Sequence, residues 1–487
     1  MKRINALLVV VMVILSMSLI PANAQTGLPA LCSGVQLQNT NTTLSAQVNM
    51  EFYKEGDNDG TANYTHGPIT LAKSASQSYY IPNVLPSTVP DGIYAVVVYS
   101  SEVLNSLVNE NSCSGSTAYV GASHSGVRQS TDTSTAMRAG SPVYLAFVLS
   151  RAYAPASWSS ALAVQNAGSA TATNVRVDFY TSGSPTPVET FTNNDLKAGE
   201  TWYLDLSSGT YATTNLNGFS GSAKITADQP VAAVANYAPG NGSKLLSYNG
   251  VTGGGQTLYA PQVTKHFAAG DYTSGITLYN LGTSSTPISI EFYRSGETTP
   301  LYTLPASVGG SAAYVLYFGN IADANLPTNF NGTAVVKVTS GSNEIVGITN
   351  MDSAAGQSAA INMIPWKERA YDLYMPQIVR TAFGGFESGW QVVNTTSSSL
   401  TLTIEYWKDD NTLTFTDHKP LPAKSALTNY VGSAAFESTI GDNWNGGAII
   451  KVDGDAGTIV GQGNFVAPNP GDGLLIYNAF AGRQPTP

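Results

Sequence analysis

Short runs of alternating apolar and polar residues fill this chain, and clusters of Gly, Ser, Asn and Asp separate them. Alternation with a period of two places apolar side chains on one face of an extended strand, and helical periodicity is nearly absent. In the clearest stretch the predicted strands are LYAPQV (258–263), SGITLYN (274–280), PISIEFY (287–293), PLYTL (300–304), SAAYVLYF (311–318), GTAVVKV (332–338), EIVGITN (344–350) and AAINMI (359–364). Seven or eight short strands in about 110 residues are typical of an antiparallel β-sandwich.

The same pattern occurs four times along the chain. An Asn ends a strand-like run in each copy, with spacings of 127, 114 and 114 residues: Asn39, Asn166, Asn280 and Asn394. A second series with the same spacings comprises Asn109, Asn236, Asn350 and Asn464. Asn tolerates the left-handed backbone conformation and hydrogen-bonds nearby backbone groups, so we expect both series to form turns or link sheets at strand ends. A fixed period of this length indicates tandem domains.

The sequence therefore predicts an all-β protein with four tandem antiparallel β-sandwich (Ig-like) domains after a signal peptide. We expect repeat 1 with its linker at 25–140, repeat 2 at 141–255, repeat 3 at 256–370 and repeat 4 at 371–487. Residues 121–142 have the composition of a flexible linker. A propeller with two blades per repeat is the competing architecture, but the two halves of a repeat share only the general likeness of two apolar hairpins.

The N-terminus predicts export. Lys2 and Arg3 precede an apolar stretch at 6–20 and the small-residue site Ala22-Asn23-Ala24, which is the pattern of a secretory signal peptide spanning 1–24. Cleavage after Ala24 would give a secreted protein of the extracellular space or cell surface. No later stretch approaches about 18 consecutive apolar residues, so the sequence predicts no membrane span.

The net charge of the chain limits which classes of partner we expect. Charged residues make up 11% of the chain, and the net charge at pH 7 is −10. Loss of Lys2 and Arg3 with the signal peptide takes the net charge to −12. An acidic protein is repelled by phosphate backbones, so nucleic acid is not an expected partner.

The two cysteines, Cys32 and Cys113, both fall in repeat 1. Two cysteines within one domain of an exported chain predict a disulfide between them. Free thiols, or links between molecules, are the alternatives.

The third predicted strand of each repeat carries an acid and an aromatic on the face opposite to the apolar one. The pairs are Glu51/Tyr53, Asp178/Tyr180, Glu291/Tyr293 and Glu405/Trp407. An aromatic ring beside a carboxylate suits a sugar, whose C–H face stacks on the ring while its hydroxyls form hydrogen bonds with the carboxylate. These pairs are therefore candidate carbohydrate-binding residues. Alternatively they shape a solvated sheet face or pack against a neighbouring strand or domain.

One acidic segment resembles a calcium loop. Glu55, Asp57 and Asp59 alternate before Gly60, but position 12 of such a loop is His66 instead of a bidentate Glu. A polar hairpin turn also accounts for the segment. Calcium is the one cofactor that the sequence suggests.

The sequence contains no HExxH or GxSxG motif and no paired Cys and His residues at metal-ligand spacing. The segment Ser123-His124-Ser125 lies in the expected linker, where no scaffold would orient a catalytic group. We therefore name no catalytic residue and expect no enzyme; a secreted hydrolase with a distributed site is the third functional hypothesis.

This organisation resembles the tandem immunoglobulin-like and fibronectin-III-like sandwich repeats of secreted bacterial surface proteins. The resemblance is one of architecture and repeat pattern over the whole chain after the signal peptide. It implies a secreted structural or adhesive protein of the cell surface or extracellular matrix, with surface proteins, matrix proteins or glycans as partners and multivalent contact as the mechanism. Carbohydrate binding through the acid–aromatic pairs is the alternative function.

Overall fold

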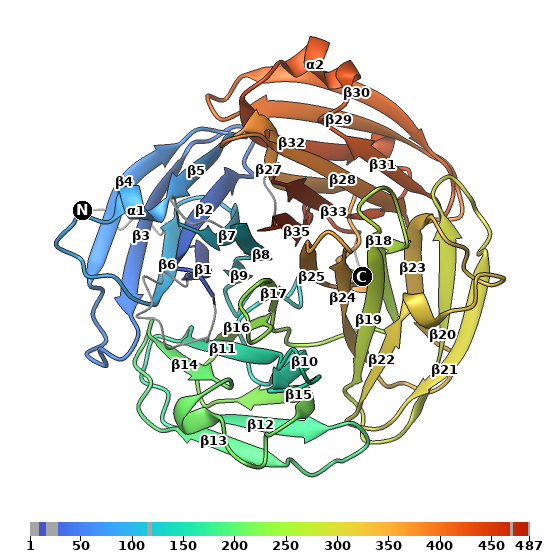
Figure 1. The fold of residues 1–487 in the computed structure, drawn as a ribbon. Coiled ribbons are helices and arrows are strands. Elements are labelled where there is room, and N and C mark those ends of the chain that lie inside the picture. The colour runs from blue at the N-terminus through green and yellow to red at the C-terminus, as the bar shows by residue number, and fades with distance from the viewer. Residues whose placement is uncertain (1–8, 16–27, 114–118, 468–470, 486–487) are drawn as a thin grey trace.

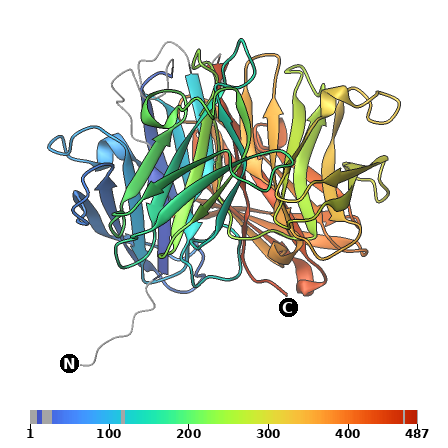
Figure 2. The same ribbon diagram turned by 90° about the horizontal axis from the view of Figure 1, so that it is seen from below.

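The structure is a computed structural model that describes residues 9–15, 28–113, 119–467 and 471–485. It is all-β with several antiparallel sheets, so the predicted fold class is confirmed at that level. The four repeats surround a common centre (Figure 1), and from the side their strands run alongside one another with loops gathered at both ends (Figure 2). The predicted cleavage site at Ala24 lies outside the described residues.

Repeats 2 and 3 have matching sets of strands. Repeat 2 contains β10 (Val143–Ser150), β11 (Ser159–Asn166), β12 (Val175–Thr181), β13 (Glu189–Asn193), β14 (Thr201–Asp205), η1 (Gly209–Tyr211), β15 (Phe219–Thr226), β16 (Val231–Ala238) and β17 (Leu246–Asn249). Repeat 3 contains β18 (Thr257–Lys265), β19 (Thr273–Asn280), β20 (Thr286–Arg294), β21 (Tyr302–Val308), β22 (Ala313–Tyr317), η2 (Phe318–Asn320), β23 (Phe330–Val338), β24 (Ile345–Asp352), β25 (Ser358–Asn362), β26 (Ile364–Pro365) and η3 (Trp366–Glu368). The eight strands predicted in repeat 3 are all present.

Repeats 4 and 1 follow the same plan. Repeat 4 contains β27 (Asp372–Ala382), β28 (Phe386–Asn394), β29 (Leu400–Lys408), β30 (Leu413–Leu421), β31 (Ala426–Tyr430), α2 (Ala434–Ile440), β32 (Trp444–Val452), η4 (Asp453–Asp455), β33 (Ile459–Val466), β34 (Gly471–Asp472), β35 (Leu474–Asn478) and β36 (Phe480–Ala481). Repeat 1 contains β2 (Leu31–Asn39), β3 (Ala46–Lys54), β4 (Tyr64–Leu71), β5 (Ser76–Tyr80), α1 (Ile81–Val84), β6 (Tyr94–Ser100), β7 (Leu104–Ser112), β8 (Tyr119–Ser125) and β9 (Val127–Arg128). A further strand, β1 (Val9–Leu15), completes a sheet of repeat 1.

The strand order recurs from repeat to repeat. The sheets of repeat 2 have the orders β10-β15-β12-β13 and β14-β11-β16-β17, and repeat 3 reproduces them as β18-β23-β20-β21 and β22-β19-β24-β25. Most consecutive strands therefore lie in different sheets. A propeller blade pairs consecutive strands within one sheet, so this connectivity favours a sandwich.

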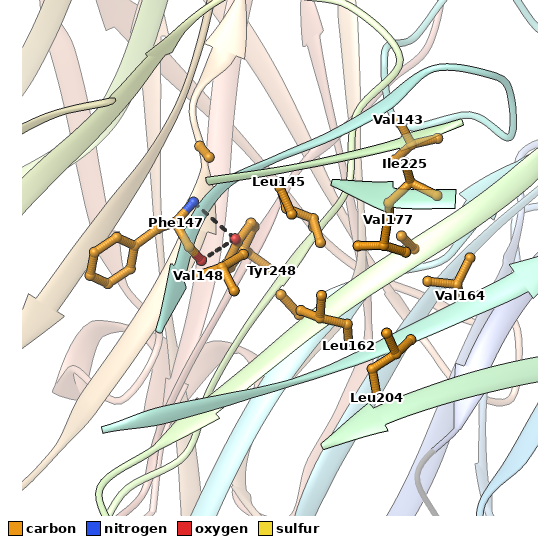
Figure 3. Close-up of a cluster of buried hydrophobic side chains, with 14 of the residues drawn as sticks. Val143, Leu145, Phe147, Val148, Leu162, Val164, Val177, Leu204, Ile225 and Tyr248 are labelled. Atoms are coloured by element: carbon orange, nitrogen blue, oxygen red, sulfur yellow. Dashed lines mark hydrogen bonds between the residues drawn. The ribbon is translucent and has the colours of Figure 1, made fainter. Parts of the chain in front are cut away.

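The two sheets of repeat 2 face each other across a shared apolar core (Figure 3). Its fully buried side chains come from both sheets: Leu145, Val177 and Ile225 from one, and Leu162, Val164 and Leu204 from the other. Tyr248 brings a hydroxyl into this core. That hydroxyl accepts a hydrogen bond from the backbone N of Phe147 (3.1 Å) and donates to the Phe147 carbonyl, so the buried polar group is satisfied.

The first Asn series joins the end of the second strand of each repeat to the turn that follows it and to the chain at or just after the end of the fourth strand. Asn166, at the end of β11, donates from Nδ2 to the Leu196 carbonyl (2.8 Å), and its Oδ1 accepts from Gly168 N (2.9 Å). The other three residues make the equivalent contacts: Asn39 with Leu71 and Asn41, Asn280 with Val308 and Gly282, and Asn394 with Leu421 and Thr396. The predicted turn-forming role of this series at strand ends is confirmed.

One strand from each repeat lies at the centre of the ring: β8, β17, β25 and β35 (Figure 1). Asn249 in β17 accepts at Oδ1 from Ser125 N (3.1 Å) and donates from Nδ2 to the Ser125 carbonyl (2.7 Å). Asn362 in β25 makes the same two contacts with the backbone of Asn249. Because β34 of repeat 4 pairs in parallel with β8 of repeat 1, the ring is closed.

The segment expected to be a flexible linker is built into this ring. Residues 119–125 form the central strand β8, and 127–128 form β9. Further along, the Glu368 carboxylate accepts from Ala136 N (2.6 Å) and Thr135 Oγ1 (3.1 Å), which fastens the segment to repeat 3. The expectation of a flexible linker at 121–142 was wrong, because composition does not reveal that its Ser and Thr side chains have partners in distant repeats.

The disulfide predicted between Cys32 and Cys113 is confirmed, with Cα atoms 4.9 Å apart. Cys32 lies in β2, and Cys113 directly follows β7, the strand with which β2 pairs. The bond therefore joins two neighbouring strands of repeat 1 and closes a loop across 81 residues of sequence.

Replacing both cysteines by Ser should lower the free energy of unfolding of repeat 1. For a loop of 81 residues the chain-entropy model gives about 4–5 kcal/mol, because the open chain gains conformational freedom on unfolding. Urea unfolding of the intact exported protein measures the change. A reductant should destabilise the original protein and leave the double variant unaffected; an equal response of both would contradict the assignment.

Candidate functional site

The second Asn series spans the joints between repeats. Its members lie within β7, β16, β24 and β33 and point to the preceding repeat in the ring, instead of ending strands as expected. Their partners are Gln377 for Asn109 (2.6 Å), Glu110 for Asn236 (2.7 Å), Tyr237 for Asn350 (2.6 Å) and Gln262 for Asn464 (3.3 Å). The expected sheet-linking role therefore becomes a role in linking repeats.

A bulge in the first strand of a repeat supplies the other half of two of these joints. The bulges of β18 and β27 present Gln262 and Gln377, whose side-chain oxygens accept from Asn464 and Asn109. The equivalent bulge in β10 presents Phe147. A phenyl ring cannot accept an amide hydrogen bond in this way, so the joint between repeats 2 and 3 lacks the Gln–Asn bridge.

An aromatic groove of about 210 Å³ lies at the joint between repeats 2 and 3. Repeat 2 lines it with Phe147, Tyr153, Trp158 and Tyr237, and repeat 3 with Val315, Tyr317 and Asn350 among others. Tyr153 and Tyr317 are 54% and 46% exposed, so their rings are accessible to a ligand. The groove combines open aromatic surface with the amide of Asn350 and the nearby carboxylate of Asp352.

The acid–aromatic pairs do not form one solvent-facing surface, because the tyrosines of repeats 1 and 3 are buried. Their parity is as predicted, away from the core of their own repeat, but that face meets the next repeat. Tyr53 is 8% exposed and packs near Ala232 of repeat 2, and Tyr293 is 5% exposed and packs with Val393 of repeat 4. The ring faces needed for sugar stacking are therefore covered at these two positions, whereas Tyr180 and Trp407 remain partly exposed.

The acids of these pairs have partners within their own sheets. Tyr53 and Tyr293 donate to Glu51 (2.7 Å) and Glu291 (2.5 Å) through their hydroxyls, and Trp407 donates to Glu405 (3.1 Å). Lysines or arginines complete three of the sites: Arg176 with Asp178, Lys337 with Glu291, and Lys451 with Glu405. These contacts favour the packing alternative over carbohydrate recognition at the pairs.

The segment that resembles a calcium loop forms the turn after β3. Asp57 accepts from the Asn63 amide (2.5 Å). Asp59 accepts from Thr61 Oγ1 (2.7 Å) and from Thr61 N (2.8 Å), and these hydrogen bonds, chiefly that from the hydroxyl, lower the pKa of Asp59. Glu55 is partly buried, and burial raises its pKa. Among the described residues no cluster of three or more His, Cys, Asp or Glu side chains has metal-binding geometry.

The segment Ser123-His124-Ser125 lies in the central strand β8, and all three residues are buried. His124 Nδ1 is 3.1 Å from Ser247 Oγ in β17, and Ser123 Oγ donates to the Ile476 carbonyl of β35 (3.2 Å). These side chains connect repeat 1 to repeats 2 and 4, and their burial withholds them from solvent.

Asp472 in β34 connects all four repeats. It belongs to repeat 4, and its strand pairs with β8 of repeat 1. Its carboxylate accepts from Leu245 N of repeat 2 (2.7 Å) and from Ser358 Oγ of repeat 3 (2.9 Å), as well as from Ser358 N. Asp472 is 0% exposed, and this burial raises its pKa to about 8 against the opposing effects of these donors and of Lys244.

The aromatic groove and the central Asp472 were not predicted. No recognisable local motif contains Asn249, Asn362 or Asp472. The residues of the groove come from two repeats, so no single stretch of sequence indicates it. A comparison of the repeats at the LYAPQ and LYMPQ segments (258–262 and 373–377) with VYLAF (143–147) could have indicated that the joint of repeat 2 differs.

No protein-family model matches this chain, and no curated protein matches its sequence. Within the part of the chain that the structure describes, no helix is long and apolar enough to cross a bilayer.

Titration of Asp472 should make stability depend on pH. Its pKa rises from the ordinary value of 3.8 to about 8 on folding, so the folded protein holds the proton more tightly. Stability is then greatest below pH 4 for this group and falls as pH rises towards 8. Across this window the urea midpoint of the original protein should fall more steeply than that of Asp472→Asn, whose side chain cannot titrate. Parallel slopes would contradict the assignment.

Proposed function

We propose that this chain is an exported structural or adhesive protein of the cell surface or extracellular matrix that acts by multivalent contact. It has four Ig-like sandwich domains with the boundaries expected from the repeat. The observation that carries the proposal is the use of the repeated residues: both Asn series and the acid–aromatic pairs hold sheets and repeats together. A disulfide in repeat 1 suits an oxidising extracellular compartment.

Equivalent tyrosines at the outer edges of three repeats support multivalent contact. Tyr80, Tyr317 and Tyr430 end the edge strands β5, β22 and β31 and are 38%, 46% and 52% exposed. Each pairs with a Gly at the same position of its repeat: Gly34, Gly275 and Gly389. Because the joints hold the four repeats in one closed ring, the three tyrosine side chains have fixed spacing. Simultaneous contacts by all three raise avidity beyond that of one site.

Carbohydrate binding is the second candidate function, and the aromatic groove favours it. Tyr153 and Tyr317 offer exposed rings for stacking, and Asn350 and Asp352 offer hydrogen-bonding groups beside them. This hypothesis moves the sugar site from the acid–aromatic pairs to the joint between repeats 2 and 3.

Two Tyr→Ala changes distinguish these functions. Tyr153 lines the groove, whereas Tyr430 occupies in repeat 4 the position of Tyr317 and lies away from the groove. Both side chains are about half exposed, so each change should alter stability by no more than about 0.5 kcal/mol. Adhesion of protein-coated beads to cells and matrix-coated plates, with a glycan array in parallel, measures the effects.

Adhesion by multivalent contact predicts that Tyr430→Ala weakens bead adhesion several-fold and that Tyr153→Ala leaves it unchanged. Carbohydrate binding predicts glycan-array signals that Tyr153→Ala lowers at least tenfold and Tyr430→Ala preserves. A panel of hydrolase substrates provides the test against an enzyme, since turnover by the purified protein would overturn both proposals.

A further inference from the structure

Strand β1 comes from within the predicted signal peptide. It comprises Val9–Leu15 and pairs antiparallel with β6 along seven residue pairs, from Val9 opposite Ser100 to Leu15 opposite Tyr94. On its other side it pairs with β9 at Val127 and Arg128. In the sheet it therefore stands between β6 and β9 (Figure 1).

This place belongs to the first strand in every other repeat. An aromatic of the third strand lies opposite a small residue of the sixth, which in turn lies opposite a residue of the first strand. The three sets are Phe179, Ala223 and Leu145; Phe292, Ala334 and Ala260; and Tyr406, Ala448 and Met375. Phe52, Val96 and Val13 form the same register in repeat 1. The sandwich plan thus requires a strand here.

The neighbouring strand β6 is apolar on both faces. Val96 and Val98 belong to the core of repeat 1, whereas Ala95 and Val97 belong to the apolar contact with repeat 2 that includes Ala232. All four are at most 2% exposed. A strand at this place must therefore be apolar at consecutive positions, as VVVMVIL (9–15) is.

Cleavage after Ala24 removes β1 together with the signal peptide. The edge of β6 then loses its hydrogen-bonding partner, and buried backbone groups without partners are costly. We propose that the mature protein carries an open strand-acceptor groove between β6 and β9, and that an extended, uncharged, β-branched segment of a partner protein fills it by β-strand addition. The inference rests on the proposed function only in requiring export.

The partner is a different polypeptide and not a second folded copy. The apolar runs among the described residues already form strands of the sheets. Leu28, near the predicted N-terminus of the mature protein, packs against the apolar cluster that includes Leu31. The other first strands show which chemistry fits: VYLAFVLS in β10 is apolar through its central residues, and TLYAPQVTK in β18 is uncharged there, with Gln262 as its one polar side chain. Charge at these central positions would be buried without a partner.

The test uses protein exported from the full chain, with its N-terminus established by intact mass. The probe is a fluorescent synthetic peptide with VVVMVIL between lysine pairs, and the control peptide carries Met12→Pro, which removes a backbone donor. Anisotropy should show saturable binding that is at least tenfold weaker for the control peptide. Hydrogen exchange should show that the first peptide adds protection at those amides of 94–100 that face the groove, since the other amides of β6 already bond to β3.

A matched protein that keeps residues 9–487 behind a different leader should not bind the peptide, because its own β1 fills the groove. The proposal is overturned if the exported protein retains 9–15, or if the mature protein protects the groove-facing amides of 94–100 by itself and binds no peptide. Absence of free thiols confirms that repeat 1 has folded. Bead adhesion is measured on the same samples: loss of adhesion alone contradicts the proposed function, and loss of peptide binding alone contradicts the groove.

Discussion

Hydrogen bonds that half-buried Asn side chains make across the joints determine how the four repeats are arranged. A side-chain amide that is removed from water without gaining a hydrogen bond destabilises the folded state. The Asn residues in β7, β16, β24 and β33 would lose their bonds to water in this way if an apolar surface covered them. Gln262 and Gln377 meet two of these side chains from neighbouring repeats. Each Asn of this series bonds to the preceding repeat, as the donor at three joints and as the acceptor from Tyr237 at the fourth. The last repeat must therefore meet the first, and a closed ring gives every joint a hydrogen bond.

Local structure was accessible from the sequence because its signals are local. Alternation gave the strands of repeat 3, the first Asn series sits beside the turn that it stabilises, and two cysteines in one repeat had few ways to pair. Alternation also assigned the correct face to Tyr53 and Tyr293. It could not tell whether that face meets water or another repeat, so their burial was missed.

The arrangement of repeats depends on residues that have no signal near them in sequence. Asp472 contacts residues 227 and 114 positions away, and no pattern of neighbours distinguishes it from a surface carboxylate. The prediction of a flexible linker at 121–142 was wrong for the same reason, because its Ser and Thr side chains have partners in other repeats. The candidate groove lies where Phe147 replaces the Gln found at the equivalent positions, Gln262 and Gln377. The effect of this difference becomes clear only when the repeats are compared in the structure.

Ring closure also sets the order in which the molecule can be completed. The central strand β8 receives its partner β34 from near the end of the chain. During synthesis from the N-terminus, repeat 1 therefore spends most of the chain's emergence with one flank uncovered. Passage through an export channel lengthens that interval, during which the first repeat must stay folded without contacts from repeat 4. A covalent cross-link in that repeat, and in none of the later ones, places extra stability in the part of the protein that waits longest for its neighbour.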